Sequence, residues 1–171
     1  MDEQGARQPV SAMRPKFLTI LCYLTLFGSV YMSFSAISGL ANPDGLTSST
    51  TLAMDNWETA FEQMAMKDPS MRTSMDRVLS DVANANTPSN MRDYSFFNLV
   101  YNLLTLVGAW LMLRLKKNGF RLYVLGILIS VITPLLVFGT GNLLGQAFSL
   151  YYGISGAFFL LLYGLKTKYM E

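Results

Sequence analysis

Residues 17–40 read FLTILCYLTLFGSVYMSFSAISGL, a stretch without a single charged side chain. Three similar runs follow, SFFNLVYNLLTLVGAWLMLRL at 95–115, FRLYVLGILISVITPLLVF at 120–138 and LLGQAFSLYYGISGAFFLLLYGL at 143–165. None of the four contains an acidic residue, and the shortest has 19 residues. A helix needs roughly 20 apolar residues to cross the hydrocarbon core of a bilayer. The sequence therefore predicts an all-α, polytopic membrane protein built on a bundle of four transmembrane helices.

The composition disfavours catalysis. Only 14% of the 171 residues are charged, against about 25% in soluble domains. Histidine is absent, which removes the commonest general base and the usual zinc ligand. Six of the eleven methionines lie between residues 41 and 94. Without Cys or His beside them we interpret these as packing residues rather than Cu(I) ligands, and we expect no enzymatic activity, catalytic residue, metal or cofactor.

The charges predict how the chain crosses the membrane. The expected segments are a tail at 1–16, a span at 17–40, a loop at 41–94, a span at 95–115, a turn at 116–119, a span at 120–138, a turn at 139–142, a span at 143–165 and a tail at 166–171. The tails and the connection between the second and third spans hold nine basic residues, whereas the loop holds four basic and eight acidic residues. Because cytoplasmic flanks carry the basic excess, we expect both termini in the cytoplasm and the loop outside.

The first span and the single cysteine add to this expectation. The apolar stretch is long for a cleaved signal peptide, so we expect a retained signal anchor. Cys22 lies inside this span, which leaves the outer loop without a disulfide. The lack of disulfides and of glycosylation sequons favours a bacterial inner membrane.

The loop predicts a helical hairpin. Asn42-Pro43-Asp44-Gly45 is typical of a turn, and two amphipathic helices are expected at about 51–66 and 69–83, the second with Asp68 as N-cap and Pro69 at its first position. Apolar residues at helical spacing predict one buried face on each helix. The candidate partner-facing residues of this hairpin are Trp57, Phe61, Met71, Met75 and Leu79.

Small and polar residues predict how the spans pack, because apolar side chains gain little by leaving lipid for one another. The expected packing stripes include Gly28, Ser29 and Met32 in the first span, Gly108 in the second, Gly126 in the third, and Ser149, Gly153, Gly156 and Ala157 in the fourth. The candidate polar residues of the bundle interior are Asn98, Asn102, Thr105, Ser130 and Thr133. The two asparagines either line a polar pocket or bond to a neighbouring helix, and we favour the second interpretation because such bonds, worth about 1 kcal/mol, are common.

These patterns lead to two hypotheses about function. The first is a non-enzymatic accessory or scaffold subunit that engages another membrane protein through the hairpin. The alternative is a binding protein or pathway for a lipid or small molecule, with a polar cavity near Asn98 and Asn102. The expected partners are the lipid bilayer and either a membrane protein or further copies of the chain, with no nucleic acid. The chain lacks the loop cysteine pair of claudins and the large third loop of tetraspanins, so neither family is assigned.

Overall fold

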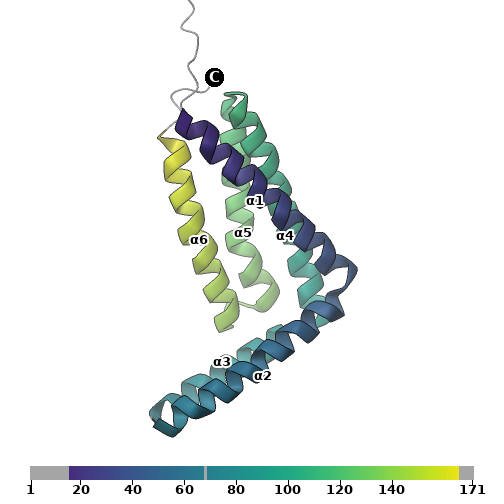
Figure 1. Cartoon of the computed structure of the whole chain (residues 1–171), viewed down its shortest axis with the longest axis vertical. Coiled ribbons are helices and arrows are strands. Elements are labelled where there is room, and N and C mark those ends of the chain that lie inside the picture. Colours follow the sequence, from purple (N-terminus) through teal and green to yellow (C-terminus); the bar gives the residue numbers. More distant parts are fainter. Residues whose placement is uncertain (1–15, 68, 166–171) are drawn as a thin grey trace, which may run out of the picture.

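A computed structural model describes residues 16–67 and 69–165, and the regular structure in these ranges is helical. The helices are α1 (Lys16–Ala41), α2 (Pro43–Lys67), α3 (Arg72–Ala85), α4 (Pro88–Leu113), α5 (Lys117–Phe138) and α6 (Leu143–Gly164), with a 3-10 turn at Pro69–Met71. Four of them, α1, α4, α5 and α6, are long and apolar enough to cross a membrane (Figure 1). This confirms the all-helical prediction for the described residues, with four helices that could make the chain a multi-pass membrane protein. Most of both predicted tails and the predicted N-cap Asp68 lie outside the described residues.

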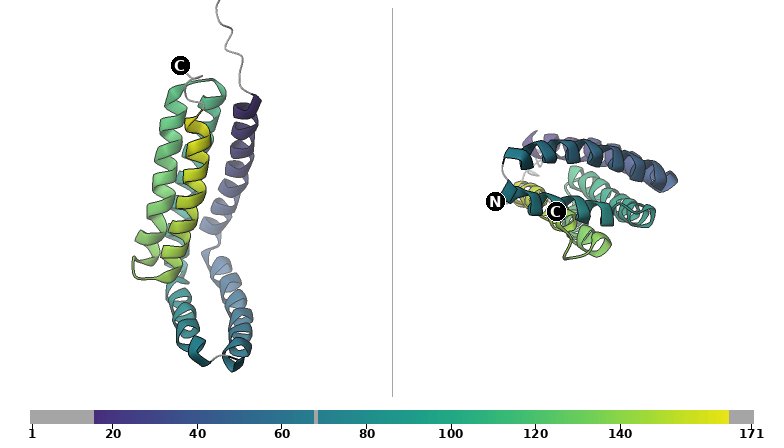
Figure 2. Two further views of the ribbon diagram at one scale, coloured as in Figure 1. Left: turned by 90° about the vertical axis from the view of Figure 1, so that its left-hand side faces the viewer. Right: turned by 90° about the horizontal axis from the view of Figure 1, so that it is seen from below.

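The four long helices form a row that closes at one end. α1 packs on α4, α4 on α5 and α5 on α6 (Figures 1 and 2). α1 and α6 meet near the end that carries the chain termini, where the Tyr163 hydroxyl donates to the Leu21 carbonyl at 3.1 Å and lies 2.8 Å from the Thr25 hydroxyl. The main buried cluster lies at the same end and consists of Leu18, Leu21, Cys22, Met112, Tyr123, Ile127 and Tyr163.

A close contact between backbones joins α4 and α5 through two glycines. A Cβ atom built on Gly119 would lie 2.6 Å from the Gly108 carbonyl oxygen and 2.7 Å from the Met112 nitrogen. The backbones approach so closely that no side chain fits between them. The sequence predicted Gly119 as part of a turn, but the structure places it within the first turn of α5.

The segment between α1 and α4, which we continue to call the hairpin, contains α2 and α3, and its helices extend further than expected at both ends. Asn42, predicted within a turn, is the single residue between α1 and α2, and its Oδ1 accepts a hydrogen bond from Gly45 N at 3.0 Å. Asn-Pro therefore acts as a helix start, with proline at the first helical position. At the other end Thr87 caps α4 by accepting from Asn90 N at 3.2 Å, so only two residues separate α3 from α4.

Asp81 on α3 fastens the hairpin to the bundle. Its carboxylate accepts a hydrogen bond from Leu143 N, at the start of α6, at 2.9 Å. The Asn142 side chain donates to the Asp81 carbonyl at 2.8 Å. A carboxylate at a helix N-terminus satisfies an orphan N–H and is stabilised by the helix dipole. The hairpin consequently lies across the end of the bundle opposite the chain termini (Figure 1).

We expect Asp81→Ala to lower the free energy of unfolding by about 1–2 kcal/mol, because α6 loses a charged N-terminal cap. Thermal unfolding and limited proteolysis of the hairpin in detergent measure this effect. The control is Asp55→Ala, which removes an exposed carboxylate from α2 and should change stability by less than about 0.5 kcal/mol. Equal effects of the two substitutions would show that Asp81 does not fasten the hairpin.

Candidate functional site

A cleft of about 360 Å³ lies between α1 and α6 and is floored by α4 and α5. We call it the lateral cleft. α1 and α6 flank it with exposed residues such as Met32 and Tyr151. Its lining residues are Leu24, Thr25, Gly28, Ser29, Met32, Asn98, Tyr101, Asn102, Thr105, Tyr123, Ile127, Tyr151, Tyr152, Ser155, Gly156 and Phe159. Because Tyr123 and Ile127 also belong to the buried cluster, the lateral cleft ends against the packed core on the terminal side.

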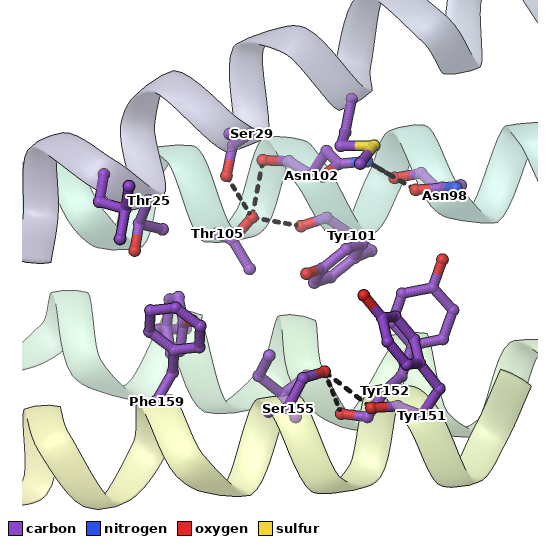
Figure 3. Close-up of a pocket in the computed structure, with 16 residues that line it drawn as sticks. Thr25, Ser29, Asn98, Tyr101, Asn102, Thr105, Tyr151, Tyr152, Ser155 and Phe159 are labelled. Atoms are coloured by element: carbon purple, nitrogen blue, oxygen red, sulfur yellow. Dashed lines mark hydrogen bonds between the residues drawn. The ribbon is translucent and has the colours of Figure 1, made fainter.

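The lateral cleft carries no charge, although many of its lining residues have a polar group. Ten of its lining residues bear a hydroxyl or an amide, and none is Asp, Glu, Lys or Arg. Figure 3 shows Tyr101 on α4 pointing across the space towards Tyr151 and Tyr152 on α6, with the Asn98 and Asn102 side chains lying along α4. Polar residues are rare at membrane depth, and when they line a cavity they usually mark a functional site.

The two asparagines bond to each other along α4. Asn102 Nδ2 donates to the Asn98 carbonyl at 2.8 Å and to Asn98 Oδ1 at 2.6 Å. These bonds use both hydrogens of the Asn102 amide. Among the described residues, Asn98 Nδ2 and Asn102 Oδ1 have no hydrogen-bond partner. The favoured sequence interpretation, a bond from these amides to a neighbouring helix, is therefore not what the structure shows.

The hydrogen bond between α1 and α4 comes instead from Ser29 and Thr105. Thr105 Oγ1 donates to carbonyls of its own helix, at 3.0 Å to Asn102 and 3.2 Å to Tyr101. Its single hydrogen is then used, so the Ser29 hydroxyl must be the donor in the 3.0 Å contact between the two side chains. Both hydroxyls have hydrogen-bond partners, and this pair joins α1 to α4 where the two residues line the lateral cleft.

Four tyrosines of the lateral cleft, Tyr101, Tyr123, Tyr151 and Tyr152, were not predicted as site residues. Tyrosine near the end of a membrane span is common as an interfacial anchor, so Tyr151 and Tyr152 do not stand out in the sequence. Tyr152 bonds to Tyr94 at 2.8 Å between hydroxyl oxygens. Tyr101 follows Asn98 by three residues, and side chains at this spacing share one helix face, so the sequence did contain a signal for it.

Ser130 and Thr133 lie apart from the lateral cleft, although both are buried on α5. The Ser130 hydroxyl donates to the Ile127 carbonyl at 2.8 Å. With Asn98 they border a space of about 10 Å³, which is at most the size of one water molecule. These two predicted residues thus belong to the packing between α4, α5 and α6.

A second pocket, the junction pocket, continues from Asn98 towards the hairpin. It has a volume of about 270 Å³, lies where α2 and α3 meet the bundle, and is lined mainly by apolar side chains such as Leu46, Trp57 and Phe148. Because Asn98 lines both spaces, the lateral cleft and the junction pocket meet at one amide.

The predicted hairpin residues separate into two places. Trp57 borders the junction pocket, whereas Phe61, Met75 and Leu79 line a groove between α2 and α3. Met71 is 44% exposed and lies in neither space.

Comparison with known proteins identifies no relative. No protein family, curated protein or solved structure matches the chain.

Proposed function

We propose that this protein binds an uncharged lipid in the lateral cleft. The observation that carries the proposal is the pair of unsatisfied amide groups, Asn98 Nδ2 as donor and Asn102 Oδ1 as acceptor, in a cleft among membrane-spanning helices. A lipid alcohol or ester can satisfy both groups. Its chain would lie in the junction pocket or in the surrounding bilayer.

Depth and charge together define the ligand class. At 1.5 Å per residue, Asn102 lies about 10 Å along α4 from Ser95, where the apolar run begins. A phosphate or ammonium group at this depth would lose its hydration without gaining a counter-charge, at a cost of several kcal/mol. A neutral head with a hydroxyl and a carbonyl, such as that of a diacylglycerol, does not meet this penalty.

Two features favour binding over transport or catalysis. The lateral cleft ends against the buried cluster around Tyr123 and Ile127, so it does not extend through the bundle. Its lining contains no carboxylate, lysine, cysteine or histidine, and these side chains supply most nucleophiles and general bases.

We also propose the membrane orientation that the distribution of charges in the sequence predicts. Both termini face the cytoplasm and the hairpin lies outside a bacterial inner membrane, as the excess of basic residues in the terminal segments supports. The accessory-subunit hypothesis depends on the hairpin rather than on the lateral cleft.

Binding is tested with two lipids that share the same chains. Protein purified in a neutral detergent is incubated with dioleoylglycerol or with dioleoyl phosphatidylglycerol, and bound lipid is quantified by native mass spectrometry. We expect saturable binding of dioleoylglycerol and at least about tenfold weaker binding of the anionic lipid, equivalent to 1.4 kcal/mol. Equal binding of both lipids would contradict recognition by uncharged groups.

The double variant Asn98→Leu and Asn102→Leu tests the two amides. We expect dioleoylglycerol affinity to fall about tenfold or more, since two hydrogen bonds of roughly 1 kcal/mol each are lost. Thermal stability should change little, because these side chains bond only within α4. Ser149→Ala, on the outward face of α6 away from the lateral cleft, is the control. Unchanged affinity in the double variant would show that the two amides do not contribute to lipid binding.

A further inference from the structure

The hairpin carries a second open groove, between α2 and α3. It has a volume of about 470 Å³ and is lined by Glu58, Phe61, Glu62, Met66, Arg72, Met75, Asp76 and Leu79. We call it the hairpin groove. Its floor contains the buried Met75 with the half-buried Phe61 and Leu79. Three of the five predicted hairpin residues, one from α2 and two from α3, therefore meet in this groove.

The rim of the hairpin groove is acidic. Glu58 and Glu62 stand one turn apart on α2, and Asp76 faces them from α3, with Arg72 as the single basic lining residue. Within the described ranges none of the three carboxylates forms an ion pair. An apolar floor between unpaired carboxylates is complementary to a helix that has one apolar face flanked by basic side chains.

The segments of this chain that carry excess positive charge are not suitable occupants. Its basic tail residues, such as Arg14 and Lys168, lie in sequence next to the ends of α1 and α6 that face away from the hairpin (Figure 1). A second copy would place an acidic hairpin against an acidic hairpin, since residues 41–94 hold eight acidic and four basic residues. Like charges brought together in this way oppose association.

We infer that the hairpin groove binds a cationic amphipathic helix of another protein on the same side of the membrane. The apolar face of that helix contacts Phe61, Met75 and Leu79. Its lysine or arginine side chains pair with Glu58, Glu62 and Asp76. This interaction makes the sequence-based accessory-subunit hypothesis specific, and it does not depend on lipid binding in the lateral cleft.

The test uses the full chain in a neutral detergent and two synthetic peptides. One is an 18-residue amphipathic Leu/Lys helix, and the other has the same pattern with Glu in place of Lys. Binding is followed by fluorescence anisotropy of the labelled peptide. We expect the Leu/Lys peptide to bind at least about tenfold more tightly than the Leu/Glu peptide, and to weaken as salt screens the charges. Equal binding of the two peptides would overturn the inference.

Matched variants distinguish binding in the hairpin groove from a general attraction to acidic residues elsewhere on the protein. The triple variant Glu58→Gln, Glu62→Gln and Asp76→Asn should weaken binding of the Leu/Lys peptide about tenfold. The control neutralises Asp44, Asp55 and Asp93 to asparagine, which removes the same charge from exposed positions outside the groove, and should change binding less than about threefold. Equal losses would show that the peptide is attracted by the overall negative charge of the hairpin and not by the hairpin groove, and would overturn the inference. Concentration-dependent dimerisation abolished by Phe61→Ser would identify a second copy as the occupant and overturn it as well.

Discussion

Gly28→Leu is expected to weaken dioleoylglycerol binding about 100-fold or more, a difference of about 2.7 kcal/mol. Gly28 lines the lateral cleft, and a Cβ atom built there meets no atom within 4 Å. A leucine side chain therefore extends into space that the ligand would occupy, without displacing a neighbour. Native mass spectrometry of the lipid complex measures the loss.

The matched control is Gly153→Leu on α6. This glycine borders the outward groove of α5 and α6, and a Cβ atom added to it would meet only Val131 Cγ2, at 4.0 Å. Both substitutions replace glycine by a better helix former, a gain of up to about 1 kcal/mol, so neither should lower the unfolding temperature. Full binding by a folded Gly28→Leu variant would place the ligand elsewhere.

Gly119→Ala is expected to destabilise the bundle by about 3 kcal/mol, the upper end for overpacking. The added methyl group would meet the Gly108 carbonyl oxygen and the Met112 nitrogen. Both are backbone atoms of α4 and cannot rotate away, so α4 and α5 must separate. Unfolding in detergent, followed by circular dichroism, gives the free-energy change.

The comparison variant for this prediction is Gly28→Ala, which places the same methyl group in open space. We expect a stability equal to or slightly above that of the unchanged protein, from helix propensity. If both alanine variants unfold alike, α4 and α5 do not make the close backbone contact described above.

The spans could be predicted from the sequence because a bilayer imposes one strong requirement, an apolar run of a fixed length. The sequence did not allow a prediction of which face of each span packs against a neighbouring helix. Gly108, Gly126 and Gly156 are buried as predicted, whereas Gly28, Met32 and Ala157 of the same predicted stripes are exposed. Lipid tolerates small residues on either face, so a stripe of them does not say whether a neighbour is present.

The candidate site was predictable in part for a similar reason. Asn98, Asn102 and Thr105 are conspicuous because amides and hydroxyls are costly in hydrocarbon, and the structure brings all three to the lateral cleft. Tyr151 and Tyr152 carry the same hydroxyl function, but tyrosine near the end of a span is ordinary interfacial anchoring. Tyr151 and Tyr152 differ from ordinary anchoring tyrosines only because α1 and α6 stand apart and leave a cleft beside them. That separation arises when the bundle assembles, so the sequence of one span does not reveal it.

The hairpin also acts as a brace for the two walls of the lateral cleft. At one end it joins α1 through the single residue Asn42, followed by Pro43 with its fixed backbone φ angle. Further along, it holds the start of α6 through Asp81. α1 and α6 meet around Tyr163 at the other end of the bundle, so on the hairpin side we expect the hairpin to influence the width of the opening. Coupling between two sites is reciprocal. A ligand that binds more tightly to a wider or narrower opening therefore also favours a different position of the hairpin on the bundle.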